Sequence, residues 1–179
     1  EDLVKIRKEE VNRAAQLLGI KSLHCWSEPD RGLVHNESLI EKIVDIIGTL
    51  APAVVFFPGP FEIHPDHRAT AFLVWSAIQQ LQKKDRAPEL IAYEIGVQNP
   101  VNLLIDVTEQ YVEKKEVMSI YTSQNSENNY QELVLALDKG RTFSLAAQVE
   151  FAEGFFRFQS KDLALSLQDM THKIVDLYQ

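Results

Sequence analysis

The chain has 179 residues, of which 45% are hydrophobic and 25% are charged, a composition typical of one globular domain. Its formal net charge is −8 with scattered Lys and Arg, which argues against a nucleic-acid partner because phosphate backbones require concentrated positive charge. No apolar run approaches the roughly 20 residues that span a bilayer, and the single cysteine, Cys25, excludes an intramolecular disulfide and favours a reducing, cytoplasmic compartment.

The sequence begins with an amphipathic helix and a short strand. Apolar residues recur at three- and four-residue intervals over residues 3–18, and Gly19 supplies a C-terminal stop signal. Residues 22–26 then read as a short strand, in which we expect Cys25 and Trp26 to be buried.

The next elements have the pattern of a helix that packs on a buried strand. Ser38 and Glu41 form a capping-box pattern at the start of a helix over residues 38–50. Residues 53–57 form an apolar run that predicts a strand buried on both faces, as in parallel sheets covered by helices.

The remaining elements alternate between strands and helices. We expect a helix over residues 65–81, strands over 89–95 and 102–107, helices near 109–121 and 130–137, an apolar segment over 148–158 and a last helix over 161–178. This alternation predicts an α/β fold with a βαβ unit. No repeat or long linker divides the sequence, so we expect a single domain over residues 1–179.

The run His64-Pro65-Asp66-His67 stands between the strand over 53–57 and the next helix. Ligands of open α/β sheets bind outside the carboxyl ends of the strands, where this run falls. Two imidazoles and a carboxylate can bind a metal and move protons. The simpler interpretation is that Pro65 and Asp66 only begin a helix and that both histidines are exposed. The spacing leaves both interpretations open, and it does not say which histidine would bind a metal.

A wider pattern resembles the PIG-L/LmbE-like deacetylases. Residues 54–69 look like that family's second signature, an apolar strand and a Pro-containing loop followed by His-Pro-Asp-His, Arg and Ala. The other matching elements, in family order, are Arg-x-x-Glu at Arg7 and Glu10, Pro-Asp-x-Gly-Leu at 29–33, Asp-x-Thr at 106–108, Lys114, Ser-Gln at 123–124 and Ala-Glu-x-Phe at 152–155.

The resemblance implies a Rossmann-like, three-layer α/β sandwich with a mostly parallel sheet. It also implies a zinc ion and hydrolysis of an N-acyl group, N-acetyl first among them, on an amino sugar or its conjugate. The family's His-Pro-Asp-Asp run, with two zinc ligands and the general base, would precede Glu1, so the expected deacetylase domain is N-terminally incomplete. Tyr121 stands where many relatives carry His before the Ser-Gln pair.

Site roles follow from the same resemblance. His67 resembles the zinc ligand, and His64 resembles the histidine that stabilises the oxyanion and protonates the leaving amine, with Asp66 orienting and charging it. Arg7 and Asp30 resemble residues that grip sugar hydroxyls. The alternative to these sugar-binding roles is a purely structural one, in which Arg7 is an exposed charge on a helix and Asp30 is an ordinary turn residue.

Two acidic residues near these motifs have no assigned role. Glu62, two residues before His64, is placed to line the mouth of the site, but we interpret it as a solvated loop residue. Glu153 lies among aromatic residues and needs a partner for its charge, in either a structural or a substrate-facing role.

Three function classes remain open. The first is a zinc-dependent N-acyl hydrolase with a small amino-sugar substrate, the second a non-catalytic carbohydrate-binding or scaffold protein of the same fold, and the third a two-metal phosphate-ester hydrolase. The sequence leaves open whether the chain forms homo-oligomers.

Overall fold

The computed structural model describes residues 2–83 and 87–177. The chain divides into two compact units. Unit 1 consists of Glu1–Ser27 and Ile105–Glu153. Unit 2 consists of Glu28–Leu104 and Gly154–Gln179.

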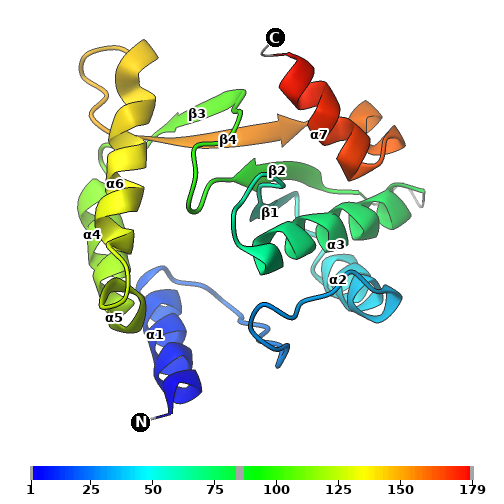
Figure 1. Cartoon of the computed structure of the whole chain (residues 1–179), viewed down its shortest axis with the longest axis horizontal. Helices are drawn as coiled ribbons and strands as arrows, with labels where there is room; N and C mark the ends of the chain where they lie inside the picture. The colour runs from blue at the N-terminus through cyan, green and yellow to red at the C-terminus, as the bar shows by residue number, and fades with distance from the viewer. Residues whose placement is uncertain (1, 84–86, 178–179) are drawn as a thin grey trace. The chain divides into compact units, whose positions relative to one another are not determined.

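Unit 2 contains the predicted βαβ unit (Figure 1). Strand β1 (Val54–Pro58) leads into helix α3 (Pro65–Gln82), which returns the chain to strand β2 (Glu89–Tyr93). The two strands are parallel, with Val54 opposite Glu89 and Pro58 opposite Tyr93. The carboxyl ends of both strands therefore lie at the same end of the sheet, where α3 begins.

The complete sheet is mixed, so the prediction of a mostly parallel sheet is not confirmed. Its strand order is β1-β2-β4-β3, with β3 over Leu103–Asp106 and β4 over Ala152–Phe158. Strand β4 runs antiparallel to β2, with Leu90 opposite Phe158. An apolar run such as β4 indicates burial but carries no information about strand direction. The prediction that β1 is buried on both faces is also wrong, because Phe56 is 52% exposed on this edge strand.

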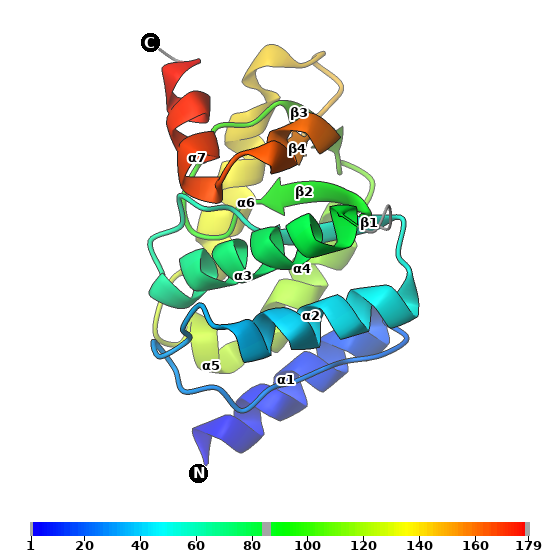
Figure 2. The same cartoon turned by 90° about the vertical axis from the view of Figure 1, so that its right-hand side faces the viewer.

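Helices of unit 2 cover one face of this sheet. Helix α2 (Glu37–Leu50) packs on α3 (Figure 2), and α3 packs on β1. The short 3-10 helix η2 (Ser160–Ala164) and helix α7 (Leu167–Asp176) complete the core. The side chains buried there include Phe57, Trp75, Ile78, Leu90, Phe158, Leu167 and Ile174.

The helix predicted over 161–178 is two elements instead of one. It breaks at Ser166, whose hydroxyl accepts the Asp169 N–H at 3.0 Å and starts a new helix as its N-cap. Residue 178 lies outside the described residues.

Unit 1 is helical. Helix α1 (Leu3–Leu17) packs against α4 (Tyr111–Ile120) and α5 (Thr122–Asn125), and α6 (Tyr130–Gly140) packs against α4 and continues as the 3-10 helix η1 (Arg141–Ser144) (Figure 1). Ala14 and Ala15 are buried on α1. Gly19 ends this helix with φ +64°, as the stop signal predicted.

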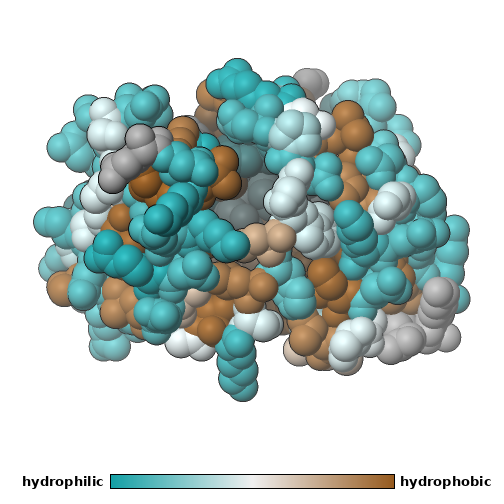
Figure 3. Space-filling view, turned by 90° about the horizontal axis from the view of Figure 1, so that it is seen from below, coloured by the Kyte–Doolittle hydropathy of each residue, from teal (hydrophilic) through white to brown (hydrophobic). Residues whose placement is uncertain are grey.

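Residues 22–26 form no strand, and each of them is exposed, Cys25 and Trp26 included. A short apolar run becomes a strand only when another strand pairs with it, which local sequence does not specify. Hydrophobic side chains also reach the surface elsewhere, as the brown atoms among the teal ones in Figure 3 show. Within the described ranges, no helix has the length and apolar character required to cross a bilayer.

Candidate active site

His64 begins helix α3 at the carboxyl end of β1. Its backbone is extended, with φ −68° and ψ 128°, and its Nδ1 accepts the Asp66 N–H at 3.3 Å. This bond satisfies one of the free amides of the first helical turn, and Pro65 suits the first helical position. Because Nδ1 is the acceptor, a neutral His64 carries its proton on Nε2.

The Asp66 carboxylate holds the Pro-Asp-x-Gly-Leu turn. Its Oδ2 accepts the Arg31 N–H at 2.8 Å, and its Oδ1 accepts the Leu33 N–H at 3.1 Å. The turn contains Arg31 in the left-handed region, with φ +57°. A Cβ at position 32 would lie 2.7 Å from Pro29 Cγ, so this position requires glycine. The two sequence motifs are therefore parts of one local structure in unit 2.

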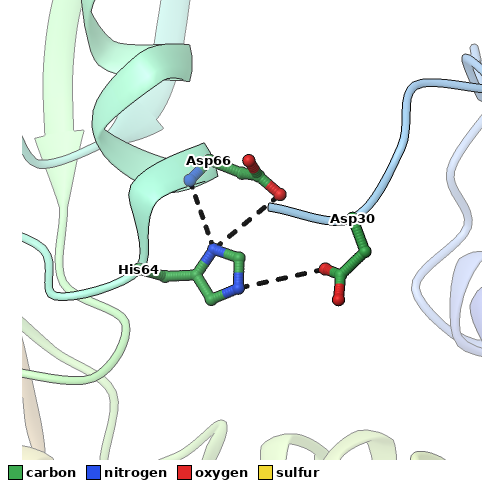
Figure 4. Close-up of side chains that lie close together, drawn as sticks. All are labelled: Asp30, His64 and Asp66. Carbon is green, nitrogen blue, oxygen red and sulfur yellow. Dashed lines mark hydrogen bonds and ion pairs between the residues drawn. The ribbon is translucent and has the colours of Figure 1, made fainter. Parts of the chain in front are cut away.

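This turn places Asp30 beside His64 (Figure 4). Asp30 Oδ1 lies 4.0 Å from His64 Nε2, and Asp66 Oδ2 lies 3.9 Å from His64 Nδ1, so a carboxylate stands near each ring nitrogen. One oxygen or nitrogen from each of these three residues lies within 4.8 Å of the others, close enough to bind one cation. The Asp30 side chain is 73% exposed, so this group of residues is open to solvent.

His67 lies one helical turn further, with its ring centroid 4.8 Å from that of His64. Its Nδ1 is buried and makes no hydrogen bond with the described residues, and Glu62 Oε2 lies 3.8 Å away. Zinc-binding histidines commonly direct one ring N–H to a carboxylate and bind the metal through the other nitrogen. Glu62 Oε2 is such a carboxylate beside His67 Nδ1, and Nε2 is the ring nitrogen left for a metal.

The interpretation of Glu62 as a solvated loop residue is wrong, because it is only 2% exposed. Its carboxylate accepts the amides of Ile95 and Gly96 and the side-chain N–H of Asn99. Burial opposes ionisation, but the His67 ring, the two amides and Asn99 hold the Glu62 pKa below its usual range. Sequence reasoning missed the burial of this residue; the signal available was a charged residue between two apolar neighbours, Phe61 and Ile63.

Arg7 lies in unit 1, on the exposed side of α1, and its guanidinium faces Gln124. With the Gln124 amide oriented to suit these donors, its oxygen accepts from Arg7 Nη2 at 3.2 Å and from Nε at 3.1 Å. Of the predicted site residues, the structure thus brings together Asp30, His64, Asp66 and His67 in unit 2, whereas Arg7 belongs to a separate network.

The same network contains Glu10, which is 4% exposed. Glu10 accepts the Thr122 hydroxyl at 3.0 Å, the Ser123 N–H at 2.8 Å and the Ser123 hydroxyl at 2.6 Å. Burial opposes its ionisation, but these hydrogen bonds and the Arg7 charge lower the Glu10 pKa. The Arg-x-x-Glu and Ser-Gln elements are therefore partners in unit 1. Burial and the Glu10 charge raise the pKa of Tyr121.

Glu153 has the partner that its surroundings require. Lys114 Nζ lies 2.5 Å from Glu153 Oε1 and 2.6 Å from Asp138 Oδ2, so one cation bridges two carboxylates inside unit 1. The ion pairs give Glu153 a structural role in this unit.

Comparison with known proteins agrees with these motifs. The family described as PIG-L, GlcNAc-PI de-N-acetylase, matches residues 1–78. Diacetylchitobiose deacetylase of Thermococcus kodakarensis is 35% identical over 80 residues, covering 43% of this chain and 30% of its own. A probable N-acetyl-α-D-glucosaminyl L-malate deacetylase 2 of Bacillus anthracis is 32% identical over 139 residues, covering 69% of this chain and 58% of its own.

Solved structures share the fold. The conserved protein TT1542 of Thermus thermophilus has a TM-score of 0.76 at 23% identity, with 87% of this chain and 74% of that chain covered. N,N'-diacetylchitobiose deacetylase of Pyrococcus horikoshii has a TM-score of 0.73 at 21% identity, with 89% and 66% covered. The chain spans less than two thirds of the length of the two curated relatives. The chain therefore carries a PIG-L family match over its first 78 residues and shares the α/β fold of these solved structures.

Proposed function

We propose that the protein is a zinc-dependent hydrolase that removes an N-acyl group, N-acetyl first among them, from an amino sugar or its conjugate. The observation that carries this proposal is the arrangement of His67, which has a buried carboxylate beside it, next to the exposed Asp30 and the half-buried His64 and Asp66. The names of the two curated relatives, which specify an N-acetylated disaccharide and an N-acetylglucosamine conjugate, support the substrate class.

His67 would hold the zinc ion through Nε2. A bound zinc supplies a Lewis acid for the amide carbonyl and lowers the pKa of a bound water. The protein's part is to keep Nε2 unprotonated, which the Glu62 carboxylate favours by drawing the ring proton to Nδ1.

His64 would stabilise the oxyanion and protonate the leaving amine. Because Nδ1 accepts the Asp66 N–H, a neutral His64 presents Nε2–H as its donor, with Asp30 Oδ1 4.0 Å from that nitrogen. Asp66 orients the ring through its backbone N–H and holds the turn of Asp30 through its carboxylate. The exposed Asp30 would bind a sugar hydroxyl, and a sugar-binding role for Arg7 in unit 1 stays a separate prediction.

Zinc content and turnover of two single variants test these roles. We expect His67→Ala to lose bound zinc, as measured by elemental analysis after dialysis. We expect His64→Ala to keep its zinc and to lose about 100- to 1000-fold in the rate of amine release from N-acetylglucosamine conjugates, the usual effect of removing an oxyanion donor.

Two outcomes would contradict the proposal. Zinc loss in His64→Ala and Asp30→Ala, with zinc retained in His67→Ala, would place the metal on the Asp30, His64 and Asp66 atoms instead. Saturable sugar binding without amine release by the zinc-loaded protein would support the alternative of a non-catalytic carbohydrate-binding protein.

A further inference from the structure

We infer that Glu62, held in place by the loop after β2, is a positioning residue that prepares His67 to bind zinc. This inference rests on the proposed function, since it concerns the same metal site. It adds a residue that neither the family motif nor the helix-start pattern points to.

Hydrogen bonds from the loop after β2 hold the Glu62 carboxylate in place. Its Oε1 accepts the Ile95 N–H at 2.9 Å and the Asn99 side-chain N–H at 3.2 Å, and its Oε2 accepts the Gly96 N–H at 3.1 Å. A buried carboxylate is costly without such partners. The two successive backbone amides therefore set the position of both oxygens, and Oε2 is the oxygen that faces His67.

The Nδ1 atom of His67 needs a hydrogen-bond acceptor when Nε2 binds zinc, and Glu62 can supply one. Its Nδ1 is buried and has no hydrogen-bond partner among the described residues. If Nε2 binds zinc, Nδ1 must carry the ring proton, and that proton needs an acceptor. Glu62 Oε2, at 3.8 Å, reaches the charge-assisted hydrogen-bond distance of about 2.8 Å after a shift of roughly 1 Å.

The loop offers a matched control for this contact. Glu94 Oε1 accepts the Asn99 N–H at 2.5 Å, so a second carboxylate stabilises the same loop. The Glu62 carboxylate is the one that faces His67 Nδ1, at 3.8 Å. Glu62→Gln and Glu94→Gln therefore both neutralise a carboxylate that binds an amide of this loop, and the first acts on the carboxylate 3.8 Å from His67 Nδ1.

Zinc affinity, measured by competition with a chromophoric chelator, tests the inference. We expect Glu62→Gln to weaken zinc binding about 10- to 100-fold, as is usual for carboxylates that orient a zinc-bound histidine. We expect Glu94→Gln to bind zinc as the wild type does. Wild-type affinity in a folded Glu62→Gln protein, or equal losses in both variants, would overturn the inference. A wild-type protein that binds no zinc would instead refute the proposed function.

A second measurement needs no variant at Glu62. Long-range proton–nitrogen NMR of the zinc-free wild type reports which ring nitrogen of each histidine is protonated, and His67→Ala identifies the His67 signals. We expect the Nδ1–H form for His67, although free histidine prefers Nε2–H. Observation of the Nε2–H form would overturn the inference even if Glu62→Gln failed to fold.

Discussion

Asp66 connects the start of helix α3 and the turn that carries Asp30 through different atoms. Its backbone N–H donates to His64, whereas its carboxylate accepts from Arg31 and Leu33. The helix start and the Asp30 turn therefore depend on one residue. This explains physically why a His-Pro-Asp-His run and a Pro-Asp-x-Gly-Leu turn occur together in this chain.

We expect Asp66→Asn to disturb the turn more than the helix. An asparagine side chain has one acceptor oxygen, so one of the two loop amides would lose its partner, at a cost of about 1–3 kcal/mol in the free energy of unfolding. The displaced Asp30 should also raise KM for the sugar. Urea denaturation and steady-state kinetics measure these effects, with Asp45→Asn on the exposed side of α2 as control. Wild-type values of both quantities would contradict the role.

Glu10 provides a pH-dependent prediction in unit 1. Its pKa is lower in the folded chain than the ordinary value of 4.5, so its ionised form stabilises the fold above that value. The contribution is lost as the pH falls through the lower, folded pKa. We expect Glu10→Gln to reduce the free energy of unfolding by about 1–3 kcal/mol at neutral pH. The difference from the wild type should shrink in acid.

Denaturant unfolding at several pH values measures this difference. Glu9→Gln is the matched control, because Glu9 is the exposed neighbour on the same helix. A difference that grows in acid, or an equal effect of both variants, would show that the Glu10 charge does not stabilise unit 1.

The candidate site was only partly predictable from its residues. His64, Asp66 and His67 lie in one run, and the turn motif pointed to Asp30. The burial of Glu62 was missed because its partners Ile95, Gly96 and Asn99 follow it by 33, 34 and 37 positions, so no local pattern reports it. Such contacts depend on how β1 and β2 pair.

At the level of elements, the start of α2 offers two candidate N-cap residues, and a pair of variants distinguishes them. The sequence predicted a capping box at Ser38, but Asn36 is the N-cap, and its Oδ1 accepts the Leu39 N–H at 2.9 Å. We expect Asn36→Ala to cost about 1 kcal/mol of unfolding free energy, the usual loss for an N-cap. Ser38→Ala should stay within about 0.5 kcal/mol of the wild type, as surface substitutions do. Equal effects in thermal unfolding would contradict this assignment.

Helices and strands differed in how well local sequence predicted them. The helices α1, α2, α3, α4 and α6 were recovered to within a few residues, because apolar periodicity and stop signals are local properties. Strand pairing is not local. Residues 22–26 have a strand-like composition but no strand partner among the described residues, and β4 pairs antiparallel with β2 despite the surrounding βαβ pattern.

At the level of the whole molecule, the proposed metal site and its supporting residues all belong to unit 2. Asp30, His64, Asp66, His67 and Glu62 lie within Glu28–Leu104. A ligand that binds only the folded state stabilises it by about 2.7 kcal/mol at a hundredfold excess over its Kd. This stabilisation should appear first in the segments that hold the site.

We therefore expect zinc to slow amide hydrogen exchange most in residues 29–33, 62–67 and 95–99. The reason is that the Asp66 and Glu62 carboxylates join the first and last of these segments to the His64–His67 run. Mass spectrometry with and without zinc measures the effect, and magnesium and His67→Ala serve as controls. Protection of residues 3–17 instead would place the metal in unit 1. Equal protection by magnesium would indicate non-selective binding to exposed carboxylates, because a histidine ligand selects zinc over that hard cation.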